Sequence, residues 1–347
     1  MIPTGKMKTA VNLDQLAARL LEARGKRVLL LPHVGADGDA IGSALALRRL
    51  LNKAGVSADV LVDEPVPEVL HFIPESAAIV QVTDAADHDP TAYDFSLLVD
   101  CHESDRIGRR APLFEATEGR GSLDHHVYQI EPGDFDVIDP TKSSTSEMVY
   151  LLLKVFETMT GETFLDAIMA NQMASGIVSD TGRFSYSNAT PGTFRVTAEL
   201  VEHGADLVTA SYELFDRISL NALRMKGLVL ARAKSHADGL ILVSTIPQKL
   251  IDVCNSSDYD LNTIPSELRN VSDVAVVFLI RETTEAGVIR VNIRSDERLN
   301  AAHLANRFGG GGHARAAGLT LRNLTLEQAA EQLIDAAMKE LASEHGD

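Results

Sequence analysis

The sequence predicts an α/β protein, in which a mostly parallel sheet flanked by helices is followed by a smaller α+β domain. In roughly the first two thirds of the chain, short apolar runs bounded by turn residues alternate with segments of helical periodicity. Past residue 234 the pattern changes, and several strand-like runs follow one another with few helices between them. At 347 residues, the chain is also long enough for two domains.

The first part of the chain supplies the elements of the parallel sheet and its covering helices. Apolar runs predict strands at 27–32, 58–62, 77–82, 95–100 and 121–125. Helical periodicity predicts helices at 13–23, 40–53, 144–160, 163–179 and 190–203. Ser144 to Glu147 match a capping box at the start of one of these helices.

The second part reads as a separate unit. Strands are expected at 240–246, 273–280, 288–294 and around 315–321, and helices at 299–306 and 326–342. A long helical stretch at 219–234 is expected to connect the two parts. We therefore predict a metal-binding domain over 1–215, a helical linker over 216–236 and a substrate-binding domain over 237–347, with the active site in the cleft between the domains.

Charge and composition limit the partners. The net charge of −17 argues against binding to long duplex DNA, whose protein partners are rich in Lys and Arg. The acidity is uneven, since residues 266–322 contain eight arginines and six acidic residues, which makes this stretch the better candidate for binding an anion. The chain lacks Trp and has few aromatic residues, so extensive base stacking is not expected.

The same composition predicts a soluble, cytoplasmic protein with no membrane contact. The N-terminus lacks the apolar segment of a signal peptide, and no run of about 18 apolar residues occurs. Cys101 and Cys254 are too few and too far apart for a disulfide scaffold or a thiolate zinc site. We expect Cys101 to be a small buried apolar residue.

Acidic residues and histidines stand where apolar runs of the first part end. The carboxyl ends of parallel strands meet at one edge of a sheet, so these side chains are expected to share one site. Carboxylates and imidazoles without thiolates suit divalent metals that act on phosphate. For His33, Asp37 and Asp39 the alternative is a solvated turn with helix-capping aspartates, but it leaves His33 and the second acid unexplained. The residues are His33, Asp37, Asp39, Asp100, Asp124, His125, His126 and Asp180.

A glycine-rich loop in the second part is the candidate for gripping the substrate. Four glycines expose backbone N–H groups and allow a phosphate or ribose to approach closely. Arginine side chains, which bind phosphate oxygens in a forked geometry, lie close by in sequence. The residues expected to bind substrate are Arg294, Gly310, Gly311, Gly312, His313 and Arg315. A flexible turn and surface arginines are the alternative. His88 and His102 have no supporting pattern and are expected to be ordinary surface or loop histidines.

These motifs together resemble those of the DHH phosphoesterase superfamily. The matching stretches are H-x3-D-G-D-x-I-G-S (33–43), Asp100 at a strand end, the Asp124-His125-His126 triplet and S-D-T-G-x-F (179–184). V-N-I-R-S (291–295) and F-G-G-G-G-H-A-R-A-A-G (308–318) resemble the DHH-associated domain of the first subfamily. Size and layout are similar to the compact bacterial nanoRNase and pAp-phosphatase members. Ala36 departs from the pattern, in which a proline commonly precedes the D-G-D.

The resemblance implies two divalent cations, most commonly Mn²⁺ in this family, with Mg²⁺, Co²⁺ and Zn²⁺ also chemically admissible. One would be held by His33, Asp37 and Asp100. The other would be held by Asp39, Asp100, His125 and Asp180, with Asp100 shared. His126 would lie beside the substrate phosphate, and either His126 or a metal-bound water would protonate the leaving oxygen, while Asp124 orients the histidines.

The resemblance also implies an activity, namely hydrolysis of short oligoribonucleotides by an exonuclease (nanoRNase) reaction. It further implies removal of the 3′-phosphate of adenosine 3′,5′-bisphosphate (pAp), with both reactions using a bridging water that the two metals activate. Alternatives are a phosphodiesterase for pApA, pGpG or cyclic di-AMP, and a catalytically silent nucleotide-binding regulator. Homodimers are common in related proteins, and one is expected here by analogy.

Overall fold

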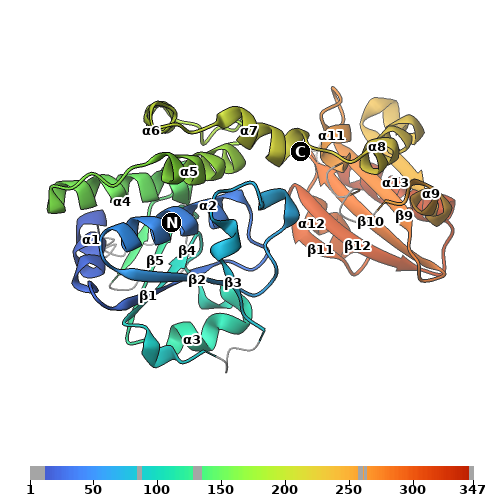
Figure 1. The fold of residues 1–347 in the computed structure, drawn as a ribbon. Coiled ribbons are helices and arrows are strands. Elements are labelled where there is room, and N and C mark those ends of the chain that lie inside the picture. Colours follow the sequence, from blue (N-terminus) through green and yellow to red (C-terminus); the bar gives the residue numbers. More distant parts are fainter. Residues whose placement is uncertain (1–11, 84–87, 128–134, 257–260, 262–263, 344–347) are drawn as a thin grey trace. The chain divides into compact units, whose positions relative to one another are not determined.

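The computed structural model describes residues 12–83, 88–127, 135–256, 261 and 264–343. The chain divides into two compact units, Met1–Arg217 and Ile218–Asp347 (Figure 1), each of which has its own hydrophobic core. The predicted fold class is confirmed: a parallel sheet flanked by helices in the first unit, and a smaller unit of mixed α and β structure in the second. No helix of the described residues is long and apolar enough to cross a bilayer.

The first unit contains a six-stranded sheet in the order β3-β2-β1-β4-β5-β6, with every pairing parallel. The strands are β1 (Arg27–Pro32), β2 (Ser57–Val62), β3 (Val80–Gln81), β4 (Phe95–Val99), β5 (Gly119–Asp124) and β6 (Asp136–Ile138). β1 is apolar on both faces because both faces are covered: Val28 and Leu30 belong to one core cluster, while Leu29 and Leu31 belong to another.

Helices cover both faces of this sheet. In Figure 1, α3 lies on one side of the strands, and α1, α2, α4 and α5 lie on the other. The helices are α1 (Leu13–Glu22), α2 (Gly38–Lys53), α3 (Ala111–Ala116), α4 (Thr145–Thr160), α5 (Ala167–Asp180), α6 (Pro191–Glu202) and α7 (Leu207–Ser211). 3₁₀ turns occupy Glu68–Leu70, Ser76–Ala78, Pro90–Ala92 and Ser104–Arg110, and a π turn occupies Tyr212–Asp216. α2 packs closely on α5, since a Cβ at Gly42 would overlap the carbonyl oxygen of Gln172.

The second unit contains a mixed sheet in the order β11-β12-β10-β9-β8-β7. Its strands are β7 (Lys234–His236), β8 (Ile241–Ile246), β9 (Val276–Glu282), β10 (Val288–Ser295), β11 (Gly311–His313) and β12 (Ala316–Arg322). Of these pairings only β8 with β9 is parallel. The helices are α8 (Leu220–Arg232), α9 (Gln248–Cys254), α11 (Ile264–Arg269), α12 (Ala301–Asn306) and α13 (Leu326–Ser343).

The segment expected as a linker, 216–236, contains α8, which packs within the second unit. Met225 and Val229 of this helix are buried in one core cluster with Val277 of β9. α8 therefore contributes to the hydrophobic core on one face of the second sheet.

Three local predictions differ from the structure. A strand was expected at 77–82, but only the two exposed residues of β3 form one, because Ser76–Ala78 form a 3₁₀ turn. The glycine-rich loop contains a short edge strand, β11, paired with β12. The capping box at α4 is half formed: Ser144 accepts from the N–H of Glu147 at 3.0 Å, but the Glu147 carboxylate accepts from Ser143.

Candidate metal centre

The carboxyl ends of β1, β4 and β5 bring the acidic residues and histidines of the first unit together. In the sheet register Pro32 pairs with Val99, and Val99 pairs with Leu123. His33, Asp100 and Asp124 are therefore neighbours at the same edge. Asp100 turns the chain there with a left-handed backbone (φ 62°), and its N–H donates to the carbonyl of Leu123 at 3.0 Å. Aspartate tolerates this conformation better than most residues with a Cβ.

A first group of potential metal ligands comprises His33, Asp37 and Asp100, each of which offers one ligand atom within 4.8 Å of the others. His33 donates from Nδ1 to the carbonyl of Val34 at 2.9 Å, which leaves Nε2 facing Asp100 Oδ2 at 3.5 Å. Asp37 also caps α2, accepting from the N–H groups of Asp39 and Ala40. The helix-capping alternative is thus correct for Asp37, and it is compatible with a place in this group.

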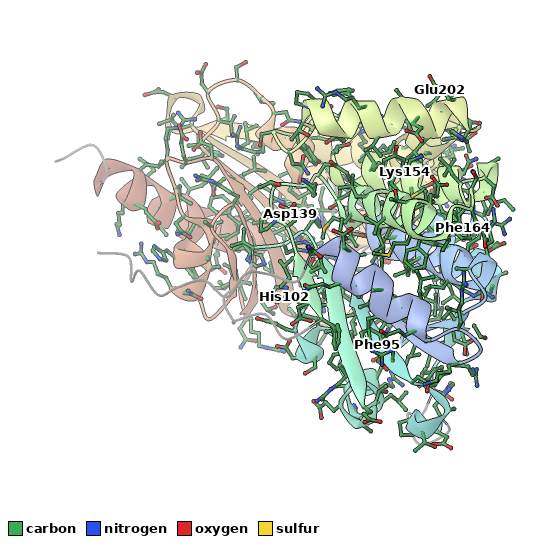
Figure 2. All side chains as sticks on the ribbon, turned by 90° about the vertical axis from the view of Figure 1, so that its left-hand side faces the viewer. Phe95, His102, Asp139, Lys154, Phe164 and Glu202 are labelled. Carbon is green, nitrogen blue, oxygen red and sulfur yellow. The ribbon has the colours of Figure 1, made fainter. Side chains whose placement is uncertain are left out.

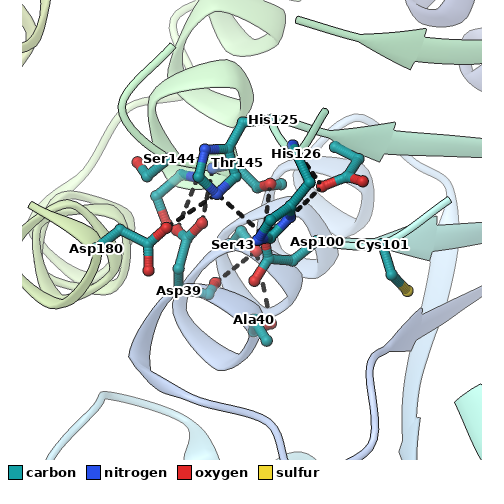
Figure 3. A network of polar contacts seen from close by, with 12 residues as sticks. Asp39, Ala40, Ser43, Asp100, Cys101, His125, His126, Ser144, Thr145 and Asp180 are labelled. Carbon is teal, nitrogen blue, oxygen red and sulfur yellow. Dashed lines mark hydrogen bonds and ion pairs between the residues drawn. The ribbon is translucent and has the colours of Figure 1, made fainter. Parts of the chain in front are cut away.

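A second group comprises Asp39, His125 and Asp180, with ligand atoms again within 4.8 Å of one another. Asp39 is fully buried, and its two carboxylate oxygens accept from the backbone N–H groups of Thr145 (2.6 Å) and Ser146 (2.9 Å) at the start of α4. His125 Nε2 lies 2.9 Å from Asp180 Oδ2 (Figure 3). The helix start of α4 therefore fixes the orientation of Asp39.

Asp100 lies between the two groups. Its Oδ2 faces His33, while its Oδ1 lies 3.6 Å from His125 Nε2 and accepts from the Thr145 hydroxyl at 2.9 Å. Figure 3 shows Asp100 and His125 directed toward one another above the start of α2. One carboxylate thus presents a different oxygen to each group, which is the arrangement needed for a ligand shared by two cations.

The described side chains neutralise only part of the negative charge of the site. Burial raises the pKa of Asp39, and the neighbouring charges of Asp100 and Asp180 raise it further. Burial also raises the pKa of Asp180. Burial opposes protonation of His125, but Asp180 and Asp39 outweigh it and raise its pKa to about 10. Among the residues that the structure describes, no Lys or Arg forms an ion pair with these carboxylates or with Asp37 and Asp100.

The ligand atoms present fit a divalent cation. His125 Nε2 is buried and lies 2.9 Å from Asp180 Oδ2 and 3.6 Å from Asp100 Oδ1, but neither contact has the geometry of a hydrogen bond. A metal ion at this point would be a well-directed partner for the nitrogen and would neutralise the carboxylates. The nitrogen and oxygen donors suit Mn²⁺, Mg²⁺, Co²⁺ or Zn²⁺.

His126 lies at the open side of this site. Its side chain is 54% exposed, and its Nδ1 lies 3.8 Å from Asp100 Oδ1. Asp124, which is fully buried, accepts from the N–H (3.1 Å) and from Nδ1 (2.8 Å) of His126. Burial would raise the pKa of Asp124, but the hydrogen bonds from His126 and His102 outweigh it and lower the pKa to about 2.

Sequence reasoning missed several residues of the site. His102 was expected to be an ordinary histidine, but its Nδ1 lies 2.5 Å from Asp124 Oδ2 and its side chain is only 12% exposed. Thr145 and Ser146 act through backbone N–H groups, which carry no sequence signal beyond the predicted helix start. Gly176 was also missed: a Cβ there would overlap Ser146 Oγ and Asp39 Oδ1, so this glycine lets α5 approach the site.

In the second unit, the structure brings three of the expected substrate-binding residues to one end of the sheet. Arg294 and His313 both pair with Ala316, one from each side, so their side chains flank a small residue on one face. Arg294 donates to the Ser266 hydroxyl at 3.3 Å, and Arg315 donates to the carbonyl of Asp296. Arg294 and Arg315 line one hollow of about 590 Å³. Burial lowers the pKa of Arg294.

Three glycines of the loop, Gly309, Gly310 and Gly311, line a second hollow of about 510 Å³, whereas Gly312 does not. Gly310 and Gly311 line it together with Arg290 and Asn292 of β10. Gly310 and Gly312 have no room for a side chain, since a Cβ at either would overlap the backbone of β12. These two glycines therefore allow β11 to lie directly against β12.

Comparisons with known proteins agree with these two units. Residues 27–177 match the model of the DHH family N-terminal domain, and residues 248–343 match that of the DHHA1 domain. The chain is 31% identical over 331 residues to the bifunctional oligoribonuclease and PAP phosphatase NrnA of Thermus thermophilus, an alignment that covers 94% of each chain.

Two solved structures share the fold. An exopolyphosphatase-related protein from Bacteroides fragilis superposes with a TM-score of 0.81 at 23% identity, covering 97% of this chain and 98% of that one. The exonuclease RecJ bound to manganese superposes with a TM-score of 0.58 at 17% identity, covering 96% of each chain. Taken with the grouped carboxylates and histidines, these similarities show that the chain belongs to the DHH family of phosphoesterases, which are metal-dependent hydrolases.

Proposed function

We propose that this protein hydrolyses short oligoribonucleotides and removes the 3′-phosphate of pAp, using two divalent cations. The observation that carries the proposal is the position of Asp100, whose two oxygens face two separate groups of potential metal ligands. We infer the substrates from the similarity to the Thermus oligoribonuclease and PAP phosphatase, an alignment that extends over nearly all of both chains.

His33, Asp37 and Asp100 would hold one cation, and Asp39, Asp100, His125 and Asp180 would hold the other. Bound there, divalent cations supply Lewis acidity: they lower the pKa of water and neutralise charge on phosphoryl oxygens. Mn²⁺ is the expected ion, because the donors are nitrogen and oxygen atoms and a protein of this fold, RecJ, has been solved bound to manganese.

The chain's own residues would bind and orient the phosphate and move the proton. Asp124 raises the pKa of His126, so this ring would start as an imidazolium with protons on both nitrogens. From the exposed side of the site it would contact the phosphate and give its Nε2 proton to the leaving oxygen, keeping the proton on Nδ1. Asp124 would keep Nδ1 of His126 protonated, so that Nε2 faces outward. In the second unit, Arg294, Arg315, His313 and the glycines Gly310–Gly312 would bind the nucleotide. At Gly311 a Cβ would meet only Asn306 Oδ1 at 3.9 Å, so this position has room for a ribose or phosphate at close range.

A substrate panel tests this proposal. Turnover is measured with di- to hexaribonucleotides and pAp, in Mn²⁺ and in EDTA. pApA, pGpG and cyclic di-AMP are included, because a dinucleotide phosphodiesterase would hydrolyse these in preference. We expect turnover of the short oligoribonucleotides and pAp in Mn²⁺ and none in EDTA. Preference for a cyclic or linear dinucleotide would replace the proposed substrates, and absence of all turnover would favour a nucleotide-binding regulator.

The variant Asp100→Asn tests the role of the shared carboxylate. It keeps the size of the side chain and removes the charge shared by the two groups, so kcat should fall by about 100-fold or more. Metal content, measured by elemental analysis, should fall with it. Asp105→Asn is the control, since Asp105 is an exposed aspartate five residues away. Unchanged turnover in Asp100→Asn would contradict the proposal.

A further inference from the structure

His102 lies outside the two groups of metal ligands but inside the polar network around them. It lies just past the carboxyl end of β4, on the side of the sheet where the site is. Phe95 lies at the other end of this strand (Figure 2). The left-handed turn at Asp100 redirects the chain just before it. Because β4 and β5 are parallel neighbours, this turn places His102 beside Asp124, the last residue of β5.

The two carboxylate oxygens of Asp124 contact two different histidines. Oδ1 accepts from His126, and Oδ2 lies 2.5 Å from Nδ1 of His102. An ionised carboxylate can only accept, so both imidazoles must donate from Nδ1. With both oxygens engaged, the fully buried carboxylate of Asp124 cannot rotate about its terminal bond without losing a hydrogen bond.

We propose that His102 is a positioning residue for phosphoester hydrolysis: by holding the second oxygen of Asp124, it fixes the orientation and tautomer of His126. This inference rests on the proposed function, which gives His126 its contact with the phosphate. His126 is half exposed and needs such support: besides its two bonds to Asp124, the nearest carboxylate oxygen among the described residues is Asp100 Oδ1, 3.8 Å from Nδ1.

The same geometry explains why a packing role alone is insufficient. A residue that merely fills space beside Asp124 needs no donor, whereas His102 directs Nδ1 at the carboxylate and keeps Nε2 toward Glu103 Oε1, 3.8 Å away. Without the donor, Oδ2 would be a buried acceptor free to compete for Nδ1 of His126. The imidazole could then turn, and Nε2 would no longer have a fixed direction.

Two substitutions separate positioning from packing. His102→Asn retains an N–H donor close to the place of Nδ1, while His102→Leu retains volume without a donor. His203→Leu is the control, because His203 is an exposed histidine of the same unit whose ring donates to the backbone carbonyl of Glu199 in the last turn of α6. Thermal melting confirms that each variant is folded before kinetics are compared.

We expect His102→Leu to lower kcat by about 10- to 100-fold with KM changed less than twofold, the usual cost of removing a partner of this kind. His102→Asn should recover most of the loss, and His203→Leu should match the unaltered protein. In metal-free protein at a pH where His126 is neutral, ¹⁵N NMR should show a single Nδ1–H tautomer of His126. The His102→Leu variant should show a mixture of tautomers.

The proposal is overturned if His102→Leu leaves both kcat and the His126 tautomer unchanged, or if His102→Asn is as impaired as His102→Leu. The NMR measurement does not depend on turnover. If the unaltered protein hydrolyses none of the substrates, the proposed function fails while the positioning of His126 is still decided by its spectrum.

Discussion

Asp39 and Asp124 are both fully buried, yet their pKa values shift in opposite directions. Asp39 receives two backbone N–H groups but faces Asp100 and Asp180, and together with burial these raise its pKa. Asp124 lies between two imidazoles that donate to it, and these outweigh burial and lower its pKa to about 2. Asp124 is therefore electrostatically satisfied by the protein, whereas Asp39 still needs a cation.

Asp166 gives a stability prediction at the scale of one residue. It caps α5 by accepting from Met169 N–H, and it pairs with Arg49 (2.9 Å) and Lys53 (3.0 Å). Burial opposes ionisation, but Arg49 and the cap outweigh it and lower the pKa to about 2. The stabilisation is therefore present above the ordinary aspartate pKa of about 4 and is lost as the pH falls toward 2.

Asp166→Asn keeps an oxygen for the cap and removes only the charge. It should lower the free energy of unfolding by about 1–2 kcal/mol at pH 7, after allowance for solvent screening of a pair near the surface. Urea unfolding measures this, and the difference from the unaltered protein should shrink toward pH 2. Asp14→Asn, in the first turn of α1, is the control. An equal difference at both pH values would show that charge is not the cause.

At the scale of elements, the contact of α5 with α2 and α4 determines how closely the ligands approach one another. Gly176 in α5 leaves room for Ser146 Oγ and Asp39 Oδ1. Gly176→Ala should force α5 outward, lowering the free energy of unfolding by about 1–2 kcal/mol and weakening metal binding. Urea unfolding and Mn²⁺ titration by calorimetry measure the two effects.

Gly227 in α8 is the matched control, since a Cβ there meets nothing within 4 Å. Gly227→Ala should leave metal binding unchanged and raise stability by up to about 1 kcal/mol, because alanine favours a helix more than glycine does. Equal behaviour of the two variants would mean that close packing at Gly176 does not support the site.

The elements themselves were mostly predictable from sequence, because apolar runs and helical periodicity are local signals. β11 was not, because glycines disfavour a strand and its pairing comes entirely from β12. The acidic residues at strand ends could be grouped from sequence, since parallel strands share an edge. His102 could not be grouped, because its partner Asp124 lies 22 residues further along, and only the adjacency of β4 and β5 brings them together.

At the scale of the whole molecule, the proposed metal ligands belong to the first unit, whereas the expected nucleotide-binding residues belong to the second. Mn²⁺ should therefore slow amide hydrogen exchange around 33–41, 99–103, 123–127 and 144–148, where backbone groups hold the carboxylates. Exchange in β9 and β10 should be unchanged by the metal. Mass spectrometry measures both, and protection confined to the second unit would contradict the placement of the cations.

The left-handed backbone at Asp100 limits which residues can replace this aspartate at the centre of the enzyme. Besides glycine, asparagine is the residue that adopts a left-handed backbone most readily, and neither residue carries a charge. A descendant that is still folded but has lost the proposed hydrolysis is therefore a single conservative substitution away.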